Sequence, residues 1–451
     1  MQYNHFMNRS IFFLPLLAAL ACAVPAAAGD GFVSASSAGF VLDGKPYHYI
    51  GANFWYAMNL GVDGPGGDRK RLGRELDRLK ALGVDNLRIV GISEGPDGAP
   101  WRMAPAAQTK PGELDETVMR GLDYALAEMG KRGQKAVIIL NNFWPWSGGM
   151  AQYLAWDHRD PIPYPPPEPG GDWNRYQKFT AAFYADPAAM AWSRRAIKTL
   201  VGRRNTITKH LYKQDSAIMA WELANEPRGI DQAEAMNKWI DETSRLIKSV
   251  DPRHLVTTGS EGDTTFPKEN GMDFTRNHSF AGIDYATIHI WAQNWDWYDP
   301  ARSTETYPGA LDKMHAYMSS HAERARAMGK PLVVEEFGLA RDSGTYDPTA
   351  GTSIKDDYYS ALFEEAYKLA ASSTPVAGVN FWAWAGEGRA RKPGTPWKAG
   401  DPWIGDPPHE LQGWYSVYDA DAGTKAVIER WARRFSALEV RVSSAATGSA
   451  P

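Results

Sequence analysis

Eight short apolar segments, separated by helix-like segments or loops, limit the folds that this chain can adopt. Their sequences are YHYIGANF, NLRIVGI, KAVIILNNF, AIMAWELAN, HLVTTGSEG, YATIHIWA, PLVVEEFG and VAGVNFWAW. Nearly all of them are uniformly apolar, which is typical of parallel strands buried on both faces. Segments with a helical pattern cover residues 68–82, 115–132, 187–212, 232–250, 310–328, 354–372 and 424–438.

Eight strand–helix units predict an α/β fold of the (β/α)8 type, the TIM barrel. The alternative, an open doubly wound sheet, would carry a glycine-rich phosphate loop after its first strand, and the sequence has none there. Before the first barrel strand, Asp43-Gly44 lies between two short strand-like runs in GFVLDGKPYHY, which predicts an N-terminal β-hairpin.

Polar and aromatic residues follow the predicted strands at their carboxyl ends, where barrels carry their chemistry. They are Asn53, Phe54, Trp55, Arg88, Asn141, Asn142, Asn225, Glu226, Glu261, His289, Glu336 and Trp382. Three long loops should cover the same face: residues 143–184, WAQNWDWYDP, and residues 386–415. The first contains PIPYPPPEPGGDW, and we expect it to be too proline-rich for regular structure. Clustered Trp in these loops favours a functional role.

Composition excludes some partners and favours another. The net charge is −4 and no long basic run occurs, which argues against nucleic acid or an anionic membrane as the main partner. The chain has 18 Trp and 20 Tyr, whose flat apolar rings with one polar atom suit stacking on sugars. Filling a large core would explain part of this content. No internal repeat or separate binding module is evident.

Residues 1–28 have the pattern of a secretory signal peptide: Arg9, an apolar run, and a small-residue site with cleavage expected after Ala28. We therefore expect a secreted or periplasmic protein with one domain over residues 29–440 and a disordered tail over 441–451. Cys22, the only cysteine, lies inside the signal. The sequence ALAC only loosely resembles a lipoprotein signal, so a lipid anchor at Cys22 stays an alternative. If cleavage follows Ala28, we expect the mature chain to have no thiol, no disulfide and no cysteine metal site.

Carboxylates at the strand ends suggest hydrolysis of a sugar bond, which needs one protonated acid and one ionised nucleophile or base. The candidates are Glu94, Glu226, Glu261, Glu335, Glu336 and Glu387. Glu222 lies four residues before Glu226, about 13 Å deeper in an extended strand, and is set aside. Neighbouring Glu335 and Glu336 should point to opposite sides of their strand, so only one of them reaches the mouth. Residue patterns alone leave several possible pairs.

Ordered motifs over almost the whole mature chain are similar to glycoside hydrolase family five. WELANEPRG and GKPLVVEEFG resemble its fourth- and seventh-strand signatures, and NNFWPWSGGM, HLVTTGSEG, IHIW, NFWAW and GWYSVYD follow in the expected order. The combination is closest to the β-mannanase branch. The resemblance implies that Glu226 is the general acid/base and Glu336 the nucleophile of a retaining enzyme.

The resemblance also implies roles for groups around the pair. Arg88 would keep Glu336 ionised and leave the proton on Glu226, although it could also be a structural partner of Glu222. Asn225 would hydrogen-bond the 2-hydroxyl of the sugar. His289 and Trp382 match the family's sixth-strand histidine and eighth-strand sugar platform, against the alternatives of a core histidine and a barrel plug.

Further substrate contacts are expected from the remaining aromatic and polar residues near the mouth. They are Trp55, Asn142, Trp144, Glu261, Trp291, Trp295 and Trp297, with Trp384 as a weaker alternate for Trp382. Trp291 departs from the family pattern, which places there a tyrosine that bonds the nucleophile. Either the Trp291 indole takes that role or another group does, such as Tyr298.

The sequence thus predicts an exported, retaining, monomeric endo-β-1,4-mannanase that acts on mannan-type polysaccharide. An exo-acting β-mannosidase or mannobiohydrolase and a β-1,4-glucanase of the same family are alternatives, because the long loops after the third and eighth strands could wall off one end of the cleft. A sugar-binding protein without catalysis is a distant alternative. The chemistry needs two glutamates and water, so no cofactor or metal is expected, and the metal-binding pattern H-E-x-x-H is absent.

Overall fold

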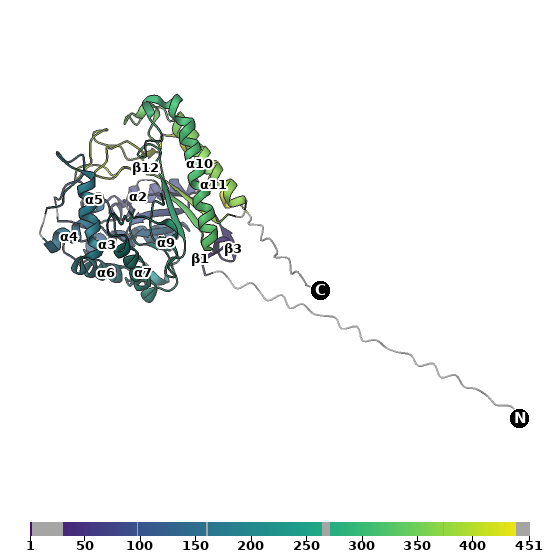
Figure 1. Cartoon of the computed structure of the whole chain (residues 1–451), viewed down its shortest axis with the longest axis horizontal. Coiled ribbons are helices and arrows are strands. Elements are labelled where there is room, and N and C mark those ends of the chain that lie inside the picture. The colour runs from purple at the N-terminus through teal and green to yellow at the C-terminus, as the bar shows by residue number, and fades with distance from the viewer. Residues whose placement is uncertain (2–29, 97, 159–160, 264–270, 373, 439–451) are drawn as a thin grey trace.

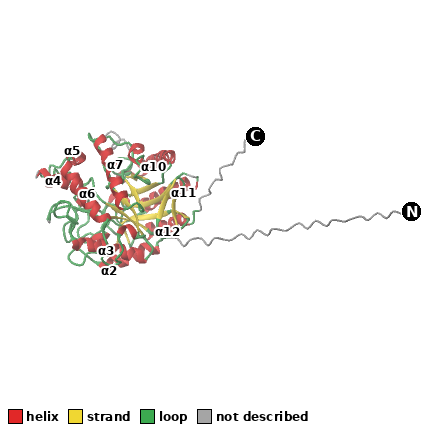
Figure 2. Cartoon of the chain, turned by 90° about the horizontal axis from the view of Figure 1, so that it is seen from below, coloured by secondary structure: helices red, strands yellow, loops and turns green. Residues whose placement is uncertain are grey.

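The computed structural model describes residues 1, 30–96, 98–158, 161–263, 271–372 and 374–438. Parallel strands lie at its centre and helices surround them (Figures 1 and 2). The strands are β4 (Tyr49–Asn53), β5 (Asn86–Val90), β6 (Lys135–Ile139), β7 (Ile218–Glu222), β8 (Leu255–Thr257), β9 (Ala286–Ile290), β10 (Leu332–Phe337) and β11 (Val376–Phe381). They pair in the order β8-β7-β6-β5-β4-β11-β10-β9.

Strands β8 and β9, at the two ends of that order, are joined by further hydrogen bonds. The Asp284 amide donates to the Val256 carbonyl at 2.8 Å and the His289 amide to the Glu261 carbonyl at 2.9 Å. These bonds bring the sheet close to a complete ring. The predicted (β/α)8 barrel is confirmed.

The N-terminal segment forms a small antiparallel sheet of β1 (Val33–Ser36), β2 (Gly39–Leu42) and β3 (Lys45–Tyr47). Asp43 and Gly44 both have positive φ, 51° and 76°, as a two-residue hairpin turn between twisted strands requires. The predicted hairpin is therefore confirmed, with β1 as an additional strand. Phe40 from this sheet packs edge-on against Tyr285 at 5.2 Å and belongs to an apolar cluster with residues at the beginning of the barrel strands. The sheet thus closes the end of the barrel opposite to the strand carboxyl ends.

The main helices follow the predicted segments closely. They are α2 (Arg69–Ala81), α3 (Glu116–Lys131), α6 (Pro187–Val201), α7 (Ala233–Val250), α10 (Ser303–Met328), α11 (Ser353–Ala371) and α12 (Ala422–Ser436). Helix α6 ends well before residue 212, because Gly202 follows and Asp123 of α3 then binds the chain through Arg203 and Thr206. Helix α10 begins earlier than expected and continues through Pro308.

The expectation that residues 143–184 lack regular structure is wrong. Helices α4 (Gly149–His158) and α5 (Trp173–Ala181) both form there. All the prolines except Pro145 lie in the stretch between them, so the sequences of the two helices contain no proline.

Short elements complete the described chain: α1 (Ala57–Leu60), α9 (Phe274–His278), β12 (Trp384–Gly386) and β13 (Val417–Tyr418), with 3-10 turns at Pro145–Ser147, Ala182–Ala185, Tyr212–Gln214, Pro300–Arg302 and Asp342–Gly344. Within the described ranges, none of the helices combines the length and apolar character needed to cross a bilayer. The expected signal peptide with Cys22 lies outside the described residues, as does the expected tail 441–451.

Removal of the Phe40 ring tests the closing role of the N-terminal sheet. Phe40 is 2% exposed, so Phe40→Ala should destabilise the fold by about 3–5 kcal/mol, measured by urea unfolding. Exposed Lys45→Ala on the same sheet is the control. Because the sheet lies away from the strand carboxyl ends, folded Phe40→Ala should keep wild-type turnover. Unchanged stability would show that the sheet does not close the barrel.

Candidate active site

Glu226 reaches the barrel mouth on an extension of β7. After the strand ends, the Asn225 amide donates to the Asn141 carbonyl at 3.0 Å and the Glu226 amide to the Gly259 carbonyl at 2.9 Å. Glu226 itself has φ of +47°, a left-handed conformation that costs a residue other than glycine about 1–3 kcal/mol. The apolar run therefore ends in a strained turn that points one carboxylate toward the barrel axis.

Glu336 comes from β10, where the pairing with β9 is irregular. Val334 pairs with Ile288 and Glu336 with His289, so Glu335 is an extra residue in a bulge. Because of the bulge, both glutamates face the interior: Glu335 lies 4.0 Å and Glu336 within hydrogen-bond distance of Arg88. The expectation of opposite sides, which holds for a regular strand, is wrong here. Only Glu336 lies beside Glu226.

The two carboxylates lie close together, with His289 between them. One oxygen of Glu226, one oxygen of Glu336 and a ring nitrogen of His289 lie within 4.8 Å of one another. Retaining glycosidases hold their carboxyl groups about 5–5.5 Å apart, whereas inverting enzymes leave about 6.5–9.5 Å for a water. The separation matches the retaining class.

Arg88 connects both sides of the barrel interior and is completely buried. Its guanidinium binds Glu222 through two nitrogens, at 2.7 and 2.5 Å, and also donates to Glu336. Burial lowers the pKa of Arg88, but the charges of Glu222 and Glu336 raise it well above its ordinary value, so the group stays a cation. Arg88 therefore contacts both partners considered from the sequence, Glu222 and Glu336.

Protonation of the pair differs from expectation because of His289. Its Nδ1 lies 2.7 Å from Glu226 Oε1 and 3.3 Å from Glu336 Oε2. Burial lowers the pKa of His289, but the charge of Glu336 and the hydrogen bond to Glu226 raise it well above its ordinary value. Burial raises the pKa of Glu226, but the hydrogen bond and charge of His289 lower it to about 2. These opposite pKa shifts favour a proton on His289 over one on Glu226, whereas the sequence-based expectation put it on Glu226.

Two asparagines fix the surroundings of Glu226. Asn225 accepts from Arg88 Nη2 at 2.8 Å and donates to Asn142 Oδ1 at 3.2 Å. Asn142 is fully buried, donates to Ser147 Oγ at 3.0 Å and accepts from the Trp144 amide at 2.9 Å. Asn142, which was expected to contact substrate, therefore also positions Asn225 and the backbone at Trp144.

Glu261 likewise positions another group. It is 1% exposed and forms a two-point ion pair with Arg228 at 2.6 and 3.1 Å. The Arg228 guanidinium lies 4.8 Å above the Trp144 ring, and the Trp144 indole donates to Glu226. Glu261 therefore does not reach a substrate as expected. Arg228 was missed in the sequence, although it stands two residues after Glu226.

The expected tryptophans divide into three groups. Trp55 is 1% exposed and donates to the Gly405 carbonyl at 2.7 Å, so it does not line a subsite as expected. Trp384 is also buried and donates to Glu75 at 3.0 Å, which excludes it as the sugar platform. Trp382 lies at the mouth between Trp146 and Trp291.

Trp295 and Trp297 form the third group. Both are half-buried and pack against each other, and their rings lie 5.5 and 6.0 Å from the Tyr317 ring.

Trp291, which stands where the family pattern has a tyrosine, packs against two other aromatic rings. The Trp291 ring contacts Trp382 at 5.8 Å and Tyr415 at 5.1 Å. Tyr298, the suggested replacement, instead donates to Ser303 at 3.1 Å, so that suggestion is wrong. The Glu336 carboxylate instead accepts from Arg88 and lies beside His289 Nδ1.

The other candidate carboxylates, Glu94 and Glu387, contact other groups. A further buried carboxylate, Glu410, was not predicted from the sequence. Glu94 is fully buried and accepts from the Gly149 amide at 2.7 Å; burial raises its pKa to about 8. Glu387 binds Arg74 and Arg78 of α2 on the outside of the barrel. Glu410, from the loop after β11, faces the catalytic pair: burial and the charges of nearby carboxylates, Glu336 and Glu226 among them, raise its pKa well above its ordinary value.

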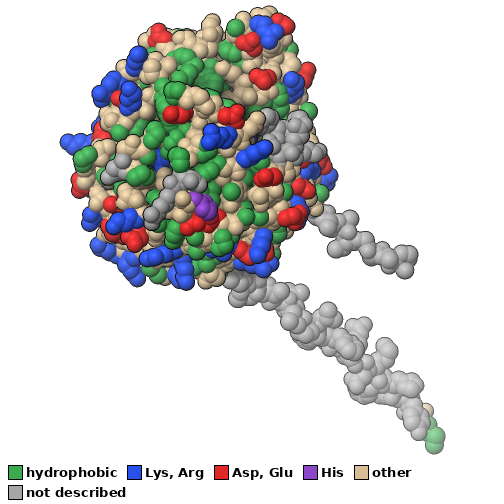
Figure 3. Space-filling model, turned by 60° about the vertical axis from the view of Figure 1, so that its left-hand side comes forward, with side chains coloured by type: hydrophobic (Ala, Val, Ile, Leu, Met, Phe, Trp, Pro, Cys, Tyr) green, Lys and Arg blue, Asp and Glu red, His purple; other side chains and the backbone are tan. Residues whose placement is uncertain are grey.

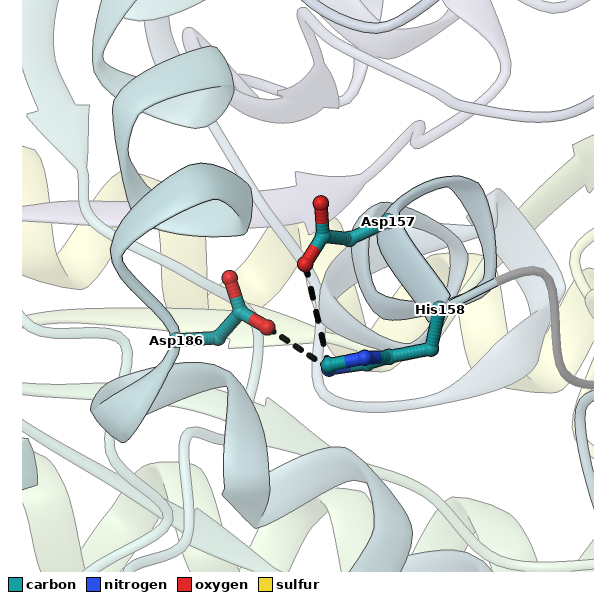
Figure 4. A group of neighbouring side chains, drawn as sticks. All are labelled: Asp157, His158 and Asp186. Carbon is teal, nitrogen blue, oxygen red and sulfur yellow. Dashed lines mark ion pairs between the residues drawn. The ribbon is translucent and has the colours of Figure 1, made fainter.

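A second group of titratable residues lies on the insertion between β6 and α6. His158 at the end of α4 lies 2.8 Å from Asp186 and 3.9 Å from Asp157 (Figure 4). Asp186 also caps α6 by accepting from the Ala189 amide at 2.8 Å. The pair thus joins the end of α4 to the beginning of α6. In Figure 3, acidic and basic side chains are interspersed among apolar ones, in agreement with the absence of a long basic run.

A (β/α)8 barrel with two neighbouring glutamates at the ends of its fourth and seventh strands is typical of glycoside hydrolases, and the close spacing of the pair resembles that of the retaining type. The chain matches the model of the GH family 5 beta-mannosidase-like family over residues 30–439 and belongs to that family. The resemblance stated from its motifs is therefore confirmed.

Relatives and solved structures agree with the family. The chain is 31% identical over 385 residues to a putative mannan endo-1,4-beta-mannosidase 4 of Arabidopsis thaliana, covering 81% of this chain and 86% of that protein. It is 31% identical over 370 residues to mannan endo-1,4-beta-mannosidase 1 of Solanum lycopersicum, covering 79% and 84%. The family 5 mannosidase of Rhizomucor miehei superimposes with a TM-score of 0.82 at 40% identity, covering 90% of this chain and 97% of that chain. Another structure of that fungal enzyme contains mannosyl-fructose.

Replacement of His289 tests where the acid proton is held. In the wild type the raised pKa of His289 keeps the cluster protonated to high pH. In His289→Gln the proton must lie on Glu226, a weaker base, so the alkaline limb of the kcat/KM profile should move to lower pH by about one unit or more. Half-buried His315→Gln on α10 is the control. A lower kcat with an unmoved alkaline limb would contradict this assignment.

Proposed function

We propose that this protein is an exo-acting β-mannosidase that removes mannose from the ends of β-1,4-linked manno-oligosaccharides with retention of configuration. The observation that carries the proposal is a contact across the barrel mouth. Trp173, on the insertion after β6, packs edge-on against His409, on the loop after β11, with 5.8 Å between ring centroids. The contact closes one way across the mouth and leaves the exposed side of Trp173 open, whereas a long chain bound through a groove would need both ways open.

Burial of the catalytic pair supports a closed pocket. Glu226 is 7% exposed, Glu336 2% and Trp382 3%. The loop after β11 covers the Glu336 side, where Tyr415 packs on Trp291 at 5.1 Å. Asp406 holds this loop by accepting from the Tyr415 and Gly413 amides. A pocket closed behind the bound sugar favours release of one residue at a time.

The mechanism follows from the groups at the pair. A Glu336 oxygen attacks the anomeric carbon while the bond from that carbon to the leaving oxygen breaks, and the proton shared by His289 and Glu226 passes through Glu226 to the leaving oxygen. Arg88 stabilises Glu336 as an anion before the attack. Once Glu336 is esterified, its negative charge is lost, and Glu226 with His289 takes a proton from the water that attacks the glycosyl ester.

Specificity for mannose is supported by relatives. The similar plant proteins are named mannan endo-1,4-beta-mannosidases, and the similar fungal enzyme is named a mannosidase. Endo action, the outcome expected from the sequence, is therefore the second candidate function, carried by the plant relatives. We also propose export to the periplasm or medium, supported by the N-terminal sequence pattern.

Product analysis separates the two functions. With mannopentaose whose reducing end has been reduced to the alditol, exo action should release mannose and the alditol one residue shorter as the first products. Galactomannan viscosity should hardly fall. Oligosaccharides of mixed length as first products, with rapid loss of viscosity, would show endo action and contradict the proposal.

Glutamate variants test the two catalytic roles. Glu336→Ala should lose about a thousandfold or more in kcat on every mannoside, because the covalent step is removed. Glu226→Ala should lose about a hundredfold or more on mannobiose but far less on p-nitrophenyl β-mannoside, whose leaving group needs no proton. Glu387→Gln is the matched control. Equal losses for Glu226→Ala on both substrates, or an active Glu336→Ala, would overturn these roles.

A further inference from the structure

Trp173 is one of few large apolar side chains that the described part of the fold leaves exposed. It is 39% exposed, alongside Ile207 at 43% and Met1. Burial of an indole normally stabilises a fold, so an exposed one held in a fixed position needs a reason. Ile207 lies between α6 and β7, at the other end of the barrel, and offers a comparison without a nearby site.

The helix that carries Trp173 is fixed against the catalytic machinery. Tyr176 of α5 donates to the Phe143 carbonyl at 2.9 Å and stacks on Trp144 at 6.3 Å. Gln177 accepts from Arg228 at 2.7 Å. At the base of the insertion, the His158–Asp186 ion pair closes the loop (Figure 4). Trp173 is therefore an exposed ring on a firmly held helix.

The contacts of Trp173 place it on the side of the acid. Its ring packs edge-on against Trp144 at 5.6 Å, and the Trp144 indole donates to Glu226. The general acid protonates the leaving oxygen, so groups beyond it face the leaving group. Trp382 stands just after β11 and packs on Trp291, which in turn contacts Tyr415 of the loop after β11.

We propose that the exposed face of Trp173 is the platform on which the leaving-group sugar stacks. This inference deepens the proposed function and rests on it. The pocket is closed on the Glu336 side and bordered by His409, so the leaving part of the substrate extends past Trp173 to solvent. A flat indole binds sugar rings of different linkage equally, so the site takes a hexose or a short β-linked oligosaccharide as leaving group.

The test compares two mannosyl donors in the full-length enzyme. Mannotriose carries a sugar leaving group, whereas β-mannosyl fluoride carries one too small to stack. Trp173→Ala should lower kcat/KM for mannotriose about tenfold more than it lowers kcat/KM for the fluoride, because only mannotriose loses a stacking contact. Trp173→Phe, which keeps an aromatic ring, should retain most of the wild-type kcat/KM for mannotriose. Ile207→Ala should change neither rate.

The results that overturn the inference are distinct. Equal losses on both donors would show that Trp173 only supports the fold of the site, and unchanged cleavage of mannotriose would show that the ring contacts no leaving group. A wild-type enzyme that cleaves neither donor would overturn the proposed function and this inference with it.

Discussion

The buried guanidinium of Arg88 is the interaction on which the catalytic end of the barrel depends. Its nitrogens bind groups from three strands or their extensions: Asn53, Glu222, Asn225 and Glu336. A buried cation is costly unless it is paired, and removing one partner of a buried pair costs about 3–5 kcal/mol. Arg88 therefore ties the geometry of Glu336 to the stability of the barrel, and the nucleophile is held by the same contacts that close the fold.

A second network holds Glu226, and the two meet at His289. Trp144, Arg228 and Glu261 fix the acid from one side, while His289 contacts both carboxylates. This arrangement gives the two glutamates different surroundings: a permanent cation for Glu336, and a histidine that can gain or lose a proton for Glu226. Different environments for similar groups are how one site supplies both an acid and a nucleophile.

Much of this could be predicted from the sequence because it depends on local pattern. Uniformly apolar strands and periodic helices predicted the barrel, and the family motifs at the strand ends predicted Glu226, Glu336 and Arg88 as site residues. The bulge at Glu335 has no local signal, since both glutamates follow an ordinary apolar run. The burial of Trp55 by Gly405 and the contact of Trp173 with His409 join segments far apart in the chain, which single-sequence patterns cannot reveal.

The most direct test of the account is to trap the covalent intermediate and locate it. A 2-deoxy-2-fluoro-mannosyl fluoride should glycosylate the enzyme and turn over slowly, and peptide mass spectrometry of the trapped protein should find the sugar on Glu336. Because Glu335 and Glu336 both face the interior, fragmentation must separate the two residues. A label on Glu335 or Glu226, or slow hydrolysis without any labelled peptide, would contradict the assignment of Glu336 as the nucleophile that Arg88 holds.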